Sequence, residues 1–184
     1  MDSILDDIIK GCLNYDVSAQ KKLFDLYSKE LLRLSLKYCE SIADAEDNVQ
    51  DTFIEVYHAI DRFKNKGSFE GWIKRIAIHK AISKFKRNLP NVSLEETKNL
   101  YPIADVTIEV EEIPLNVILE SIQKLPPQYR MVFSLYEMDD YSHQEIASLL
   151  EISEGTSKSN LHRAKLILKE QLTQYRLKHH HGAS

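Results

Sequence analysis

The segment between Ser142 and Lys165 carries the residue pattern with the clearest chemistry in this chain, because it combines helix-capping residues with polar and basic side chains. Ser142 and Glu145 have the S-x-x-E spacing of a capping box, in which each side chain caps the backbone N–H of the other residue. Apolar residues at helical spacing follow, and Ser153 is then placed to cap a second helix. The segment therefore predicts a helix-turn-helix.

The second helix of this predicted unit has two different faces. Its apolar side carries Leu161, Ala164, Leu168 and Leu172. Polar and basic side chains gather near its N-terminus, at Lys158, Ser159, Asn160, His162, Arg163 and Lys165. Such a face suits the major groove of DNA, although an ordinary helical hairpin with a solvated basic face would show the same residues.

The charges along the chain are arranged in blocks, although the net charge of the 184 residues is only −4. Seven acids and no lysine or arginine lie between Tyr38 and Asp61, whereas nine bases and one acid lie between Arg62 and Arg87. Such blocks predict separate surfaces for separate partners, one for a basic protein and others for phosphate.

The elements that must position these residues are predicted to be helical almost throughout. Helices are expected over 2–13, 18–40, 43–62 and 68–87, and again over 114–124, 127–138, 143–150 and 154–176. Between the two groups, residues 89–113 contain Pro90 and Pro102 and little helical period, and we interpret them as a flexible linker. The fold class is therefore all-α, with two small helical domains at 1–88 and 114–178, and 179–184 is interpreted as a tail left over from cloning.

The two cysteines, Cys12 and Cys39, do not form a C-x-x-C pair, and the chain has no secretory signal or long apolar run. We therefore expect buried, reduced thiols and a cytoplasmic location.

The predicted helix at 43–62 has an apolar stripe and an acidic stripe on opposite sides. Val49, Phe53, Val56, Ile60 and Phe63 follow the spacing of a core-facing stripe. The opposite side carries Asp44, Asp47, Asp51 and Glu55. Acids at this spacing repel one another by a few tenths of a kcal/mol per pair, so either a basic partner covers them or the face is simply solvated.

An ordered set of sequence blocks resembles a known family. The blocks are DAEDNVQDTFIEVYHAIDRF (44–63), SFEGWIKRIAIHKAISKFKR (68–87), LPPQYRMVF (125–133) and SEGTSKSNLHRAK (153–165). Together they resemble the extracytoplasmic-function (ECF) group of bacterial sigma-70-type sigma factors, over about residues 18–172. The resemblance implies a transcription initiation factor, not an enzyme, with no cofactor and no small-molecule substrate. The first domain would be sigma region 2 and the second the region 4 helix-turn-helix.

The resemblance also implies partners for the charged surfaces. Residues of the first block would dock on the β′ clamp helices of core RNA polymerase, and the β flap would be a second contact. The implied docking residues are Glu46, Asp47, Gln50, Asp51 and Phe53. Phe53 also belongs to the apolar stripe, so core packing is an open alternative for it. An anti-sigma factor, commonly anchored in the membrane, is a further implied partner.

In the first domain the resemblance implies contacts with the promoter −10 element. The loop between the predicted helices at 43–62 and 68–87 would capture an unstacked base of the promoter. A short polar loop with a glycine is suited to this role. Its residues are Phe63, Lys64, Asn65, Lys66, Gly67 and Ser68. The following helix would supply basic side chains that contact DNA phosphates, namely Lys74, Arg75, Lys80, Lys84 and Arg87. Trp72 is expected in the core.

In the second domain Lys158, Ser159, His162 and Arg163 match the family positions that read −35 bases, with Asn160 and Lys165 as phosphate or rim residues. Three positions depart from the family pattern. Ser157 replaces a usual valine, so we expect the recognition helix to lose an apolar anchor. His79 and Ser83 replace a usual Asn and Asp, which leaves the promoter contacts of the first domain open.

Two rival functions follow from parts of the sequence. Glu55-x-x-His58 has the spacing of helical di-iron carboxylate proteins, but that architecture needs a second such pair and further inward glutamates. A helix-turn-helix regulator that acts without polymerase would explain Ser142–Lys165 but not the acidic stripe, the basic block or the linker.

One further hypothesis concerns the acids of the linker, which would lie across the basic surfaces of the free protein in place of phosphate. These acids are Glu95, Glu96, Asp105, Glu109, Glu111 and Glu112.

Overall fold

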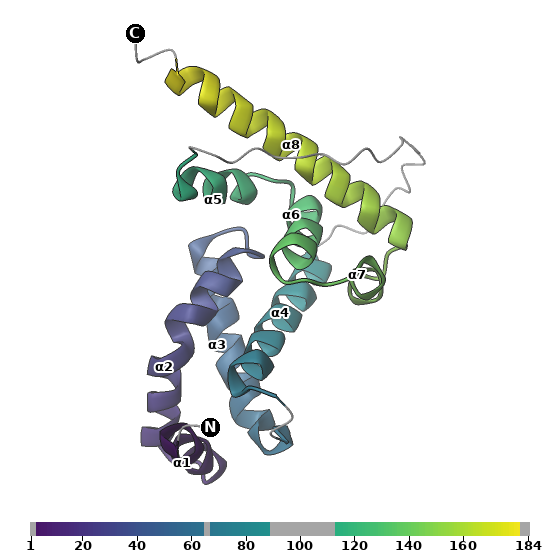
Figure 1. Ribbon diagram of the computed structural model, residues 1–184. Coiled ribbons are helices and arrows are strands. Elements are labelled where there is room, and N and C mark those ends of the chain that lie inside the picture. Colours follow the sequence, from purple (N-terminus) through teal and green to yellow (C-terminus); the bar gives the residue numbers. More distant parts are fainter. Residues whose placement is uncertain (1–2, 65–66, 89–112, 181–184) are drawn as a thin grey trace. The chain divides into compact units, whose positions relative to one another are not determined.

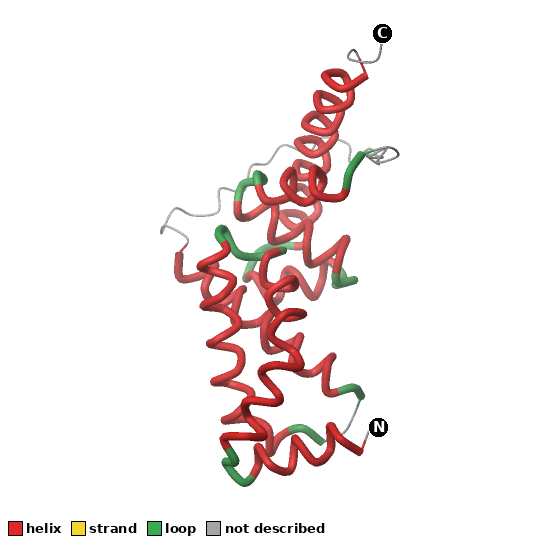
Figure 2. The backbone as a smooth tube through the Cα atoms, turned by 90° about the vertical axis from the view of Figure 1, so that its left-hand side faces the viewer, coloured by secondary structure: helices red, strands yellow, loops and turns green. Residues whose placement is uncertain are grey.

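The computed structural model describes residues 3–64, 67–88 and 113–180 (Figure 1). Within these ranges the backbone is helical apart from short connections, and no strand occurs, as the tube in Figure 2 shows. The chain divides into two compact units, Met1–Phe85 and Lys86–Ser184. The all-α prediction is therefore confirmed for the described residues.

The described residues of the first unit form four α-helices and one short 3₁₀ turn, and the last helix continues a few residues past Phe85. They are α1 (Ser3–Leu13), α2 (Val17–Leu36), α3 (Ile42–Ala59), η1 (Ile60–Arg62) and α4 (Phe69–Asn88). The predicted ranges agree to within one or two residues, with two exceptions. Helix α2 ends at Leu36 and not near residue 40, and the last three residues of the helix predicted at 43–62 form the 3₁₀ turn η1. Asp16 caps α2 by accepting a hydrogen bond from the backbone N–H of Ser18, and Ser41 caps α3 in the same way through the N–H of Asp44.

The core of the first unit lies between α2, α3 and α4. The predicted apolar stripe of α3 faces it: Val49, Phe53, Val56 and Ile60 are at most 5% exposed. Beyond the helices, Phe63 is half-buried and packs edge-on against Phe69 of α4. The apolar stripe prediction is confirmed.

One polar side chain is built into this core. Asn48 on α3 is 2% exposed, and its Nδ2 donates hydrogen bonds to Ser35 Oγ at 2.9 Å and to the Ala77 carbonyl oxygen at 3.2 Å. The amide of Asn48 thus links α3 to both α2 and α4. A buried polar group without such partners would cost ~1–3 kcal/mol, so these bonds fix the relative register of the three helices.

Helix α1 packs against the start of α2 through a close approach at Gly11. A Cβ atom added to Gly11 would lie 2.5 Å from the Cβ of Ala19. Only glycine therefore permits this contact between the helices.

Residues 113–180 of the second unit form four α-helices and a π-helical turn. They are α5 (Leu115–Gln123), α6 (Pro127–Phe133), η2 (Ser134–Met138, π-helix), α7 (His143–Leu150) and α8 (Glu154–His180). The single helix predicted at 127–138 is thus an α-helix continued by a π-helix. Its core includes Met131, Val132, Leu135, Ile146, Ala164 and Leu168, all at most 2% exposed.

The predicted helix-turn-helix is confirmed in local detail. Ser142 and Glu145 form both bonds of the capping box. Glu151 ends α7 in the left-handed conformation, with φ 58° and ψ 44°. Ser153 Oγ then accepts a hydrogen bond from the N–H of Thr156 at 3.0 Å and caps α8.

Cys12 and Cys39 are buried and form no disulfide, as expected. No helix among the described residues combines the length and the apolar character needed to cross a membrane.

Candidate nucleic-acid interface

The first turns of α8 present part of the predicted DNA-reading set to solvent. Lys158 is exposed, whereas Ser159, His162 and Arg163 are partly exposed. Asn160 is only 6% exposed, so its side chain lies in the core of the second unit and not on the rim. The helical phase explains this difference, because Asn160 lies next to Leu161 and four residues before Ala164, both of which are buried.

Two basic residues of α8 are held by residues of the preceding segment. Arg163 Nη1 donates a hydrogen bond to the hydroxyl of Tyr129 on α6 at 3.2 Å. Lys165 Nζ lies 2.7 Å from Glu137 Oε1 in η2. The Tyr129 hydroxyl limits the directions that the guanidinium of Arg163 adopts, whereas Glu137 neutralises Lys165. Neither Tyr129 nor Glu137 was singled out in the sequence, since no local pattern joins residues that are about thirty apart.

Ser157 forms a polar contact at the position where the family usually has valine. Its side chain is fully buried, and its Oγ lies 2.9 Å from Nδ1 of His143 on α7. The His143 ring stacks on Tyr136, with ring centroids 4.3 Å apart. Burial lowers the pKa of His143, and the nearby Lys158 ammonium lowers it further. The apolar contact that a valine would make is therefore replaced here by a hydrogen bond between the two helices of the motif.

The acidic face of α3 is largely open to solvent. Glu46, Asp47, Gln50 and Asp51 are exposed. Phe53, the fifth residue of the predicted docking set, is 3% exposed and packs between Phe24 and Tyr57, with centroid distances of 4.8 and 5.9 Å. Of the two roles left open for Phe53, the structure places it in the core.

The bases of α4 are not a separate surface, because acids of α3 reach two of them. Lys80 Nζ lies 3.0 Å from Glu55 Oε2. Lys84 Nζ lies 2.8 Å from Asp44 Oδ1 and 3.7 Å from Asp47 Oδ2. The Lys84 ammonium and the Ser41 hydroxyl lower the pKa of Asp44, and Lys80 lowers that of Glu55. The expectation of one acidic and one separate basic surface was wrong at these residues.

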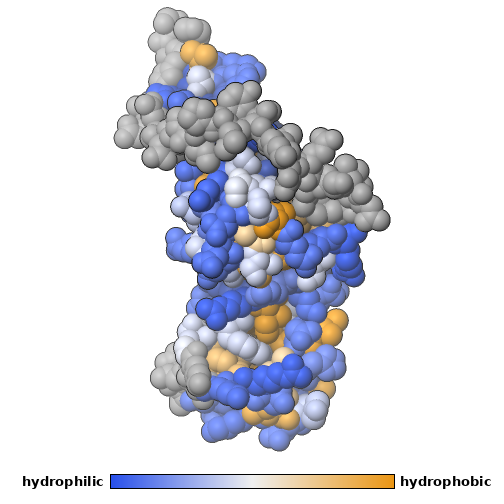
Figure 3. Space-filling model, turned by 90° about the vertical axis from the view of Figure 1, so that its right-hand side faces the viewer, coloured by the Kyte–Doolittle hydropathy of each residue, from blue (hydrophilic) through white to orange (hydrophobic). Residues whose placement is uncertain are grey.

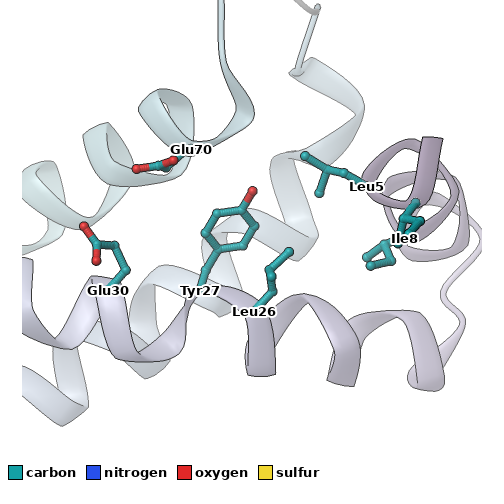
Figure 4. A pocket seen from close by; sticks show the side chains of 7 residues that line it. Leu5, Ile8, Leu26, Tyr27, Glu30 and Glu70 are labelled. Carbon is teal, nitrogen blue, oxygen red and sulfur yellow. The ribbon is translucent and has the colours of Figure 1, made fainter. Parts of the chain in front are cut away.

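A third lysine of α4 is paired with acids at the edge of a hollow. Lys74 Nζ lies 2.6 Å from Glu70 Oε1 and 3.1 Å from Glu30 Oε1. Figure 4 shows the two carboxylates on α4 and α2, near Tyr27. The open hollow beside them, of about 660 Å³, is otherwise lined by aliphatic side chains of α1 and α2. Arg75 and Arg87, the remaining predicted phosphate contacts of α4, are exposed.

The loop before α4 combines fixed ends with exposed middle positions. Phe63 packs against Trp72 at a centroid distance of 5.5 Å, and Ser68 Oγ accepts a hydrogen bond from the N–H of Gly71 at 3.0 Å. Lys64 and Gly67 are exposed, and Gly67 has φ 105°, which favours glycine. Asn65 and Lys66 lie outside the described residues.

The two departures on α4 are joined to each other by a hydrogen bond. Ser83 Oγ donates to the backbone carbonyl oxygen of His79 at 2.8 Å, and both residues are exposed. Both positions are therefore accessible to a partner.

The di-iron alternative has no support in the described part of the chain. Glu55 is paired with Lys80, His58 is exposed, and no group of three or more potential metal ligands occurs there. The six linker acids that were expected to cover the basic surfaces lie outside the described residues.

Comparison with known proteins assigns each of the two units to the same family. The model of sigma-70 region 2 matches residues 23–89, and the model of sigma-70 region 4 matches residues 115–168. The chain belongs to the ECF group of the sigma-70 family. The two matches fall on the two predicted domains and keep the order inferred from the sequence blocks.

This sigma factor is similar to several curated relatives. It is 29% identical to the ECF RNA polymerase sigma factor SigW of Bacillus subtilis, over 94% of this chain and 98% of SigW. It is 28% identical to the RNA polymerase sigma factor YlaC of the same species, over 84% of this chain and 92% of YlaC. It is also 28% identical to the ECF sigma factor SigM of Mycobacterium tuberculosis, over 82% of this chain and 75% of SigM.

A solved structure shares the fold of this sigma factor. The structure of the sigma factor RpoE from Bartonella quintana, solved with the anti-sigma factor NepR, aligns with a TM-score of 0.51 and 21% identity. The alignment covers 83% of this chain and 96% of that chain.

Proposed function

We propose that this sigma factor binds core RNA polymerase through the exposed acidic face of α3 and directs it to promoters through both of its domains. The observation that carries the proposal is the division of the chain into two helical units that match region 2 and region 4 in order. We take residues 1–88 and 114–178 as these domains and 89–113 as the linker.

The proposed docking surface consists of Glu46, Asp47, Gln50 and Asp51. All four side chains are exposed on one helix, and Phe53 supports them from the core. An acidic face of this kind is complementary to a basic helical surface, which we take to be the β′ clamp helices. The β flap is the proposed contact of the second domain.

The proposed −10 contacts are the exposed residues of the loop and of α4. Lys64 and Gly67 form the accessible middle of the described loop, and Arg75 and Arg87 are open to phosphate. We take Phe63 and Ser68 as residues that shape the loop, because one packs against Trp72 and the other caps α4.

The proposed −35 contacts are Lys158, Ser159, His162 and Arg163 at the N-terminal end of α8. Arginine and lysine at such positions donate to O6 and N7 of guanine, which is the commonest base-specific contact. We leave Asn160 out of the reading set because its side chain is buried.

The remaining partners follow from the family. The protein acts as an initiation factor and not as a catalyst, and because polymerase and promoter are cytoplasmic, we place it there. An anti-sigma factor is the proposed regulator, in keeping with the complex in which the related fold was solved.

Binding to core polymerase tests the proposal. We expect tight binding by the wild type and a loss of at least tenfold in the Asp47→Lys/Asp51→Lys variant, because each reversal turns attraction into repulsion. The matched control is Asp25→Lys/Asp61→Lys, which makes the same charge change at exposed carboxylates away from the proposed surface. If the Asp47→Lys/Asp51→Lys variant bound core polymerase as tightly as the wild type, the docking surface would have to lie elsewhere. Absence of wild-type binding, with DNA binding intact, would favour a regulator that acts without polymerase.

The second domain is tested separately in the assembled holoenzyme. We expect Lys158→Ala and Arg163→Ala to weaken promoter binding by about ten- to a hundredfold each. Lys169→Ala is the matched control, since Lys169 is an exposed lysine further along the same helix. Equal losses in all three variants would show a nonspecific charge effect and contradict the proposed reading positions.

A further inference from the structure

The ion pairs between α3 and α4 join the proposed polymerase-docking helix to the proposed phosphate-binding helix. Lys84 reaches both Asp44 and Asp47, and Lys80 reaches Glu55. Asp47 belongs to the proposed docking surface, and both lysines belong to the basic residues of α4 that the sequence predicts to contact phosphate. The same ammonium groups therefore have two kinds of anionic partner, one inside the protein and one on the DNA.

The geometry favours the internal partners in the free protein. Only 25% of the Lys84 side chain and 34% of the Lys80 side chain are exposed. The carboxylate of Asp44 is held in place by the hydroxyl of Ser41 at 2.7 Å, so Lys84 meets a partner that is already oriented. A lysine paired in this way gains less from phosphate, because its charge is already balanced and it must first leave its carboxylate partner.

We propose that Asp44 and Glu55 mask Lys84 and Lys80 in the free sigma factor, and that a basic partner surface docking on α3 releases both lysines for DNA. The inference rests on the proposed function. It names two residues, Asp44 and Glu55, that set DNA affinity without touching DNA.

The release follows from competition for the same carboxylates. A cationic surface placed against Asp47 attracts Asp44 and Glu55 as well, and it repels the ammonium groups beside them. The lysines then turn to the nearest remaining anions, which are the phosphates of the promoter. Because coupling between two binding events is reciprocal, DNA bound at α4 also strengthens polymerase docking by the same factor.

The salt dependence of DNA binding gives the most direct readout of the masking. Each phosphate neutralised on single-stranded DNA contributes about −0.7 to the slope of log affinity against log salt. If both lysines are masked, the free wild type shows a shallower slope than a variant in which they are free.

The test uses the full chain and fluorescein-labelled oligothymidylate in anisotropy titrations over a range of salt. The variant is Asp44→Asn/Glu55→Gln, and the matched control is Asp25→Asn/Asp61→Asn, which removes the same charge from other exposed carboxylates of the first domain. We expect the variant to bind about three- to tenfold more tightly than the control at low salt. We also expect its slope to be steeper by about 1. Circular dichroism checks that both proteins keep their helix content.

A background without the two lysines isolates the mechanism. In Lys80→Ala/Lys84→Ala protein, adding Asp44→Asn/Glu55→Gln should produce no gain beyond that of the control substitutions. A gain of the same size in this background would overturn the proposal, since the acids would then act only through net charge. Equal affinities and slopes for variant and control in the natural background would also overturn it.

The holoenzyme separates this inference from the proposed function. With core polymerase bound, Asp44→Asn/Glu55→Gln should no longer increase promoter affinity, because the polymerase already occupies the acidic face. An undiminished gain in the holoenzyme would overturn release by docking. Loss of core binding in Asp47→Lys/Asp51→Lys, with no masking effect in the free protein, would leave the proposed function standing and reject this inference alone.

Discussion

The hydroxyl of Ser157 lies 2.9 Å from Nδ1 of His143, and this contact joins the recognition helix α8 to α7 inside the second domain. Ser157 departs from the family pattern, and no local sequence pattern links it to His143, fourteen residues earlier. The pair replaces apolar contact by a hydrogen bond, which is directional and therefore fixes the orientation of α8 more narrowly than packing alone.

The Ser157–His143 contact is testable by a double-mutant cycle. Ser157→Ala should destabilise the second domain by about 1 kcal/mol, because it removes the hydroxyl and leaves Nδ1 of His143 unpaired. In a His143→Phe background, which keeps the ring against Tyr136, the same substitution should cost less. Hydrogen exchange of the α7 and α8 amides gives the free energies, and additive costs would contradict the contact.

Acidification should weaken the second domain through the same histidine. Because the pKa of His143 is lowered in the folded protein, the unfolded chain binds the proton first as the pH falls. The stabilisation is thus complete above the unfolded pKa of about 6.5 and is lost as the pH falls from there to the folded pKa. Hydrogen exchange between about pH 7 and pH 5 should show this loss in the wild type and a smaller one in His143→Phe. Identical pH profiles would refute the role of His143.

Removal of the buried amide of Asn48 should destabilise the first domain. Asn48→Ala leaves the Ser35 hydroxyl and the Ala77 carbonyl without this donor in the core, at an expected cost of about 2–3 kcal/mol. Urea unfolding monitored by the fluorescence of Trp72, the one tryptophan, reports on this domain. Gln50→Ala, an exposed substitution on the same helix, serves as the control and should cost less than ~0.5 kcal/mol.

Gly11→Ala should loosen the contact of α1 with α2. The added Cβ would lie 2.5 Å from the Cβ of Ala19, so the helices must separate. We expect a destabilisation of about 1–3 kcal/mol. Gly71→Ala is a suitable comparison, since its added Cβ would meet only the Ser68 hydroxyl at 3.0 Å. Equal stabilities of the Gly11 variant and the wild type would show that α1 moves freely away from α2.

The hydrogen bond from Arg163 to Tyr129 should matter for promoter selection. Tyr129→Phe removes the hydroxyl that orients the guanidinium, and we expect promoter binding by the holoenzyme to weaken by about two- to tenfold. The promoters are selected from a random library with wild-type holoenzyme. Tyr175→Phe, further along α8, is the control. If Tyr129→Phe bound the selected promoters as tightly as the wild type, the hydrogen bond to Tyr129 would not be needed to orient Arg163.

The sequence was sufficient for the helices and for the motif at Ser142–Lys165, because both depend on local periodicity and capping. Ser142, Glu145 and Ser153 act as caps at the predicted positions. The core stripe of α3 was equally predictable, since helical spacing decides which side chains share a face.

Contacts between distant residues were not predictable in the same way. The pairing of Lys84 with Asp44 depends on how α4 lies beside α3, which no local pattern specifies. Asn160 was assigned to a polar face by its residue type, although its helical phase places it inside. The polar residues Asn48 and Ser157 likewise became core residues because a partner was available across a helix interface.

The first domain carries exposed apolar side chains as well as charged ones on its surface. Figure 3 shows apolar areas among the polar ones on the face in view. Ile4, Val17, Leu26 and Ile54 are all more than half exposed. They are side chains of α1, α2 and α3 that the core of this domain leaves uncovered.

The π-helix at Ser134–Met138 has a consequence for chain length. A π-turn holds one residue more than an α-turn, so it corresponds to a single-residue insertion in a regular helix. Deleting one residue there would let α6 continue as an α-helix and would rotate every later side chain of that helix by about 100°. Tyr136 would then leave the ring of His143. A one-residue change in the length of this turn would therefore alter how η2 packs against α7, the first helix of the DNA-reading motif.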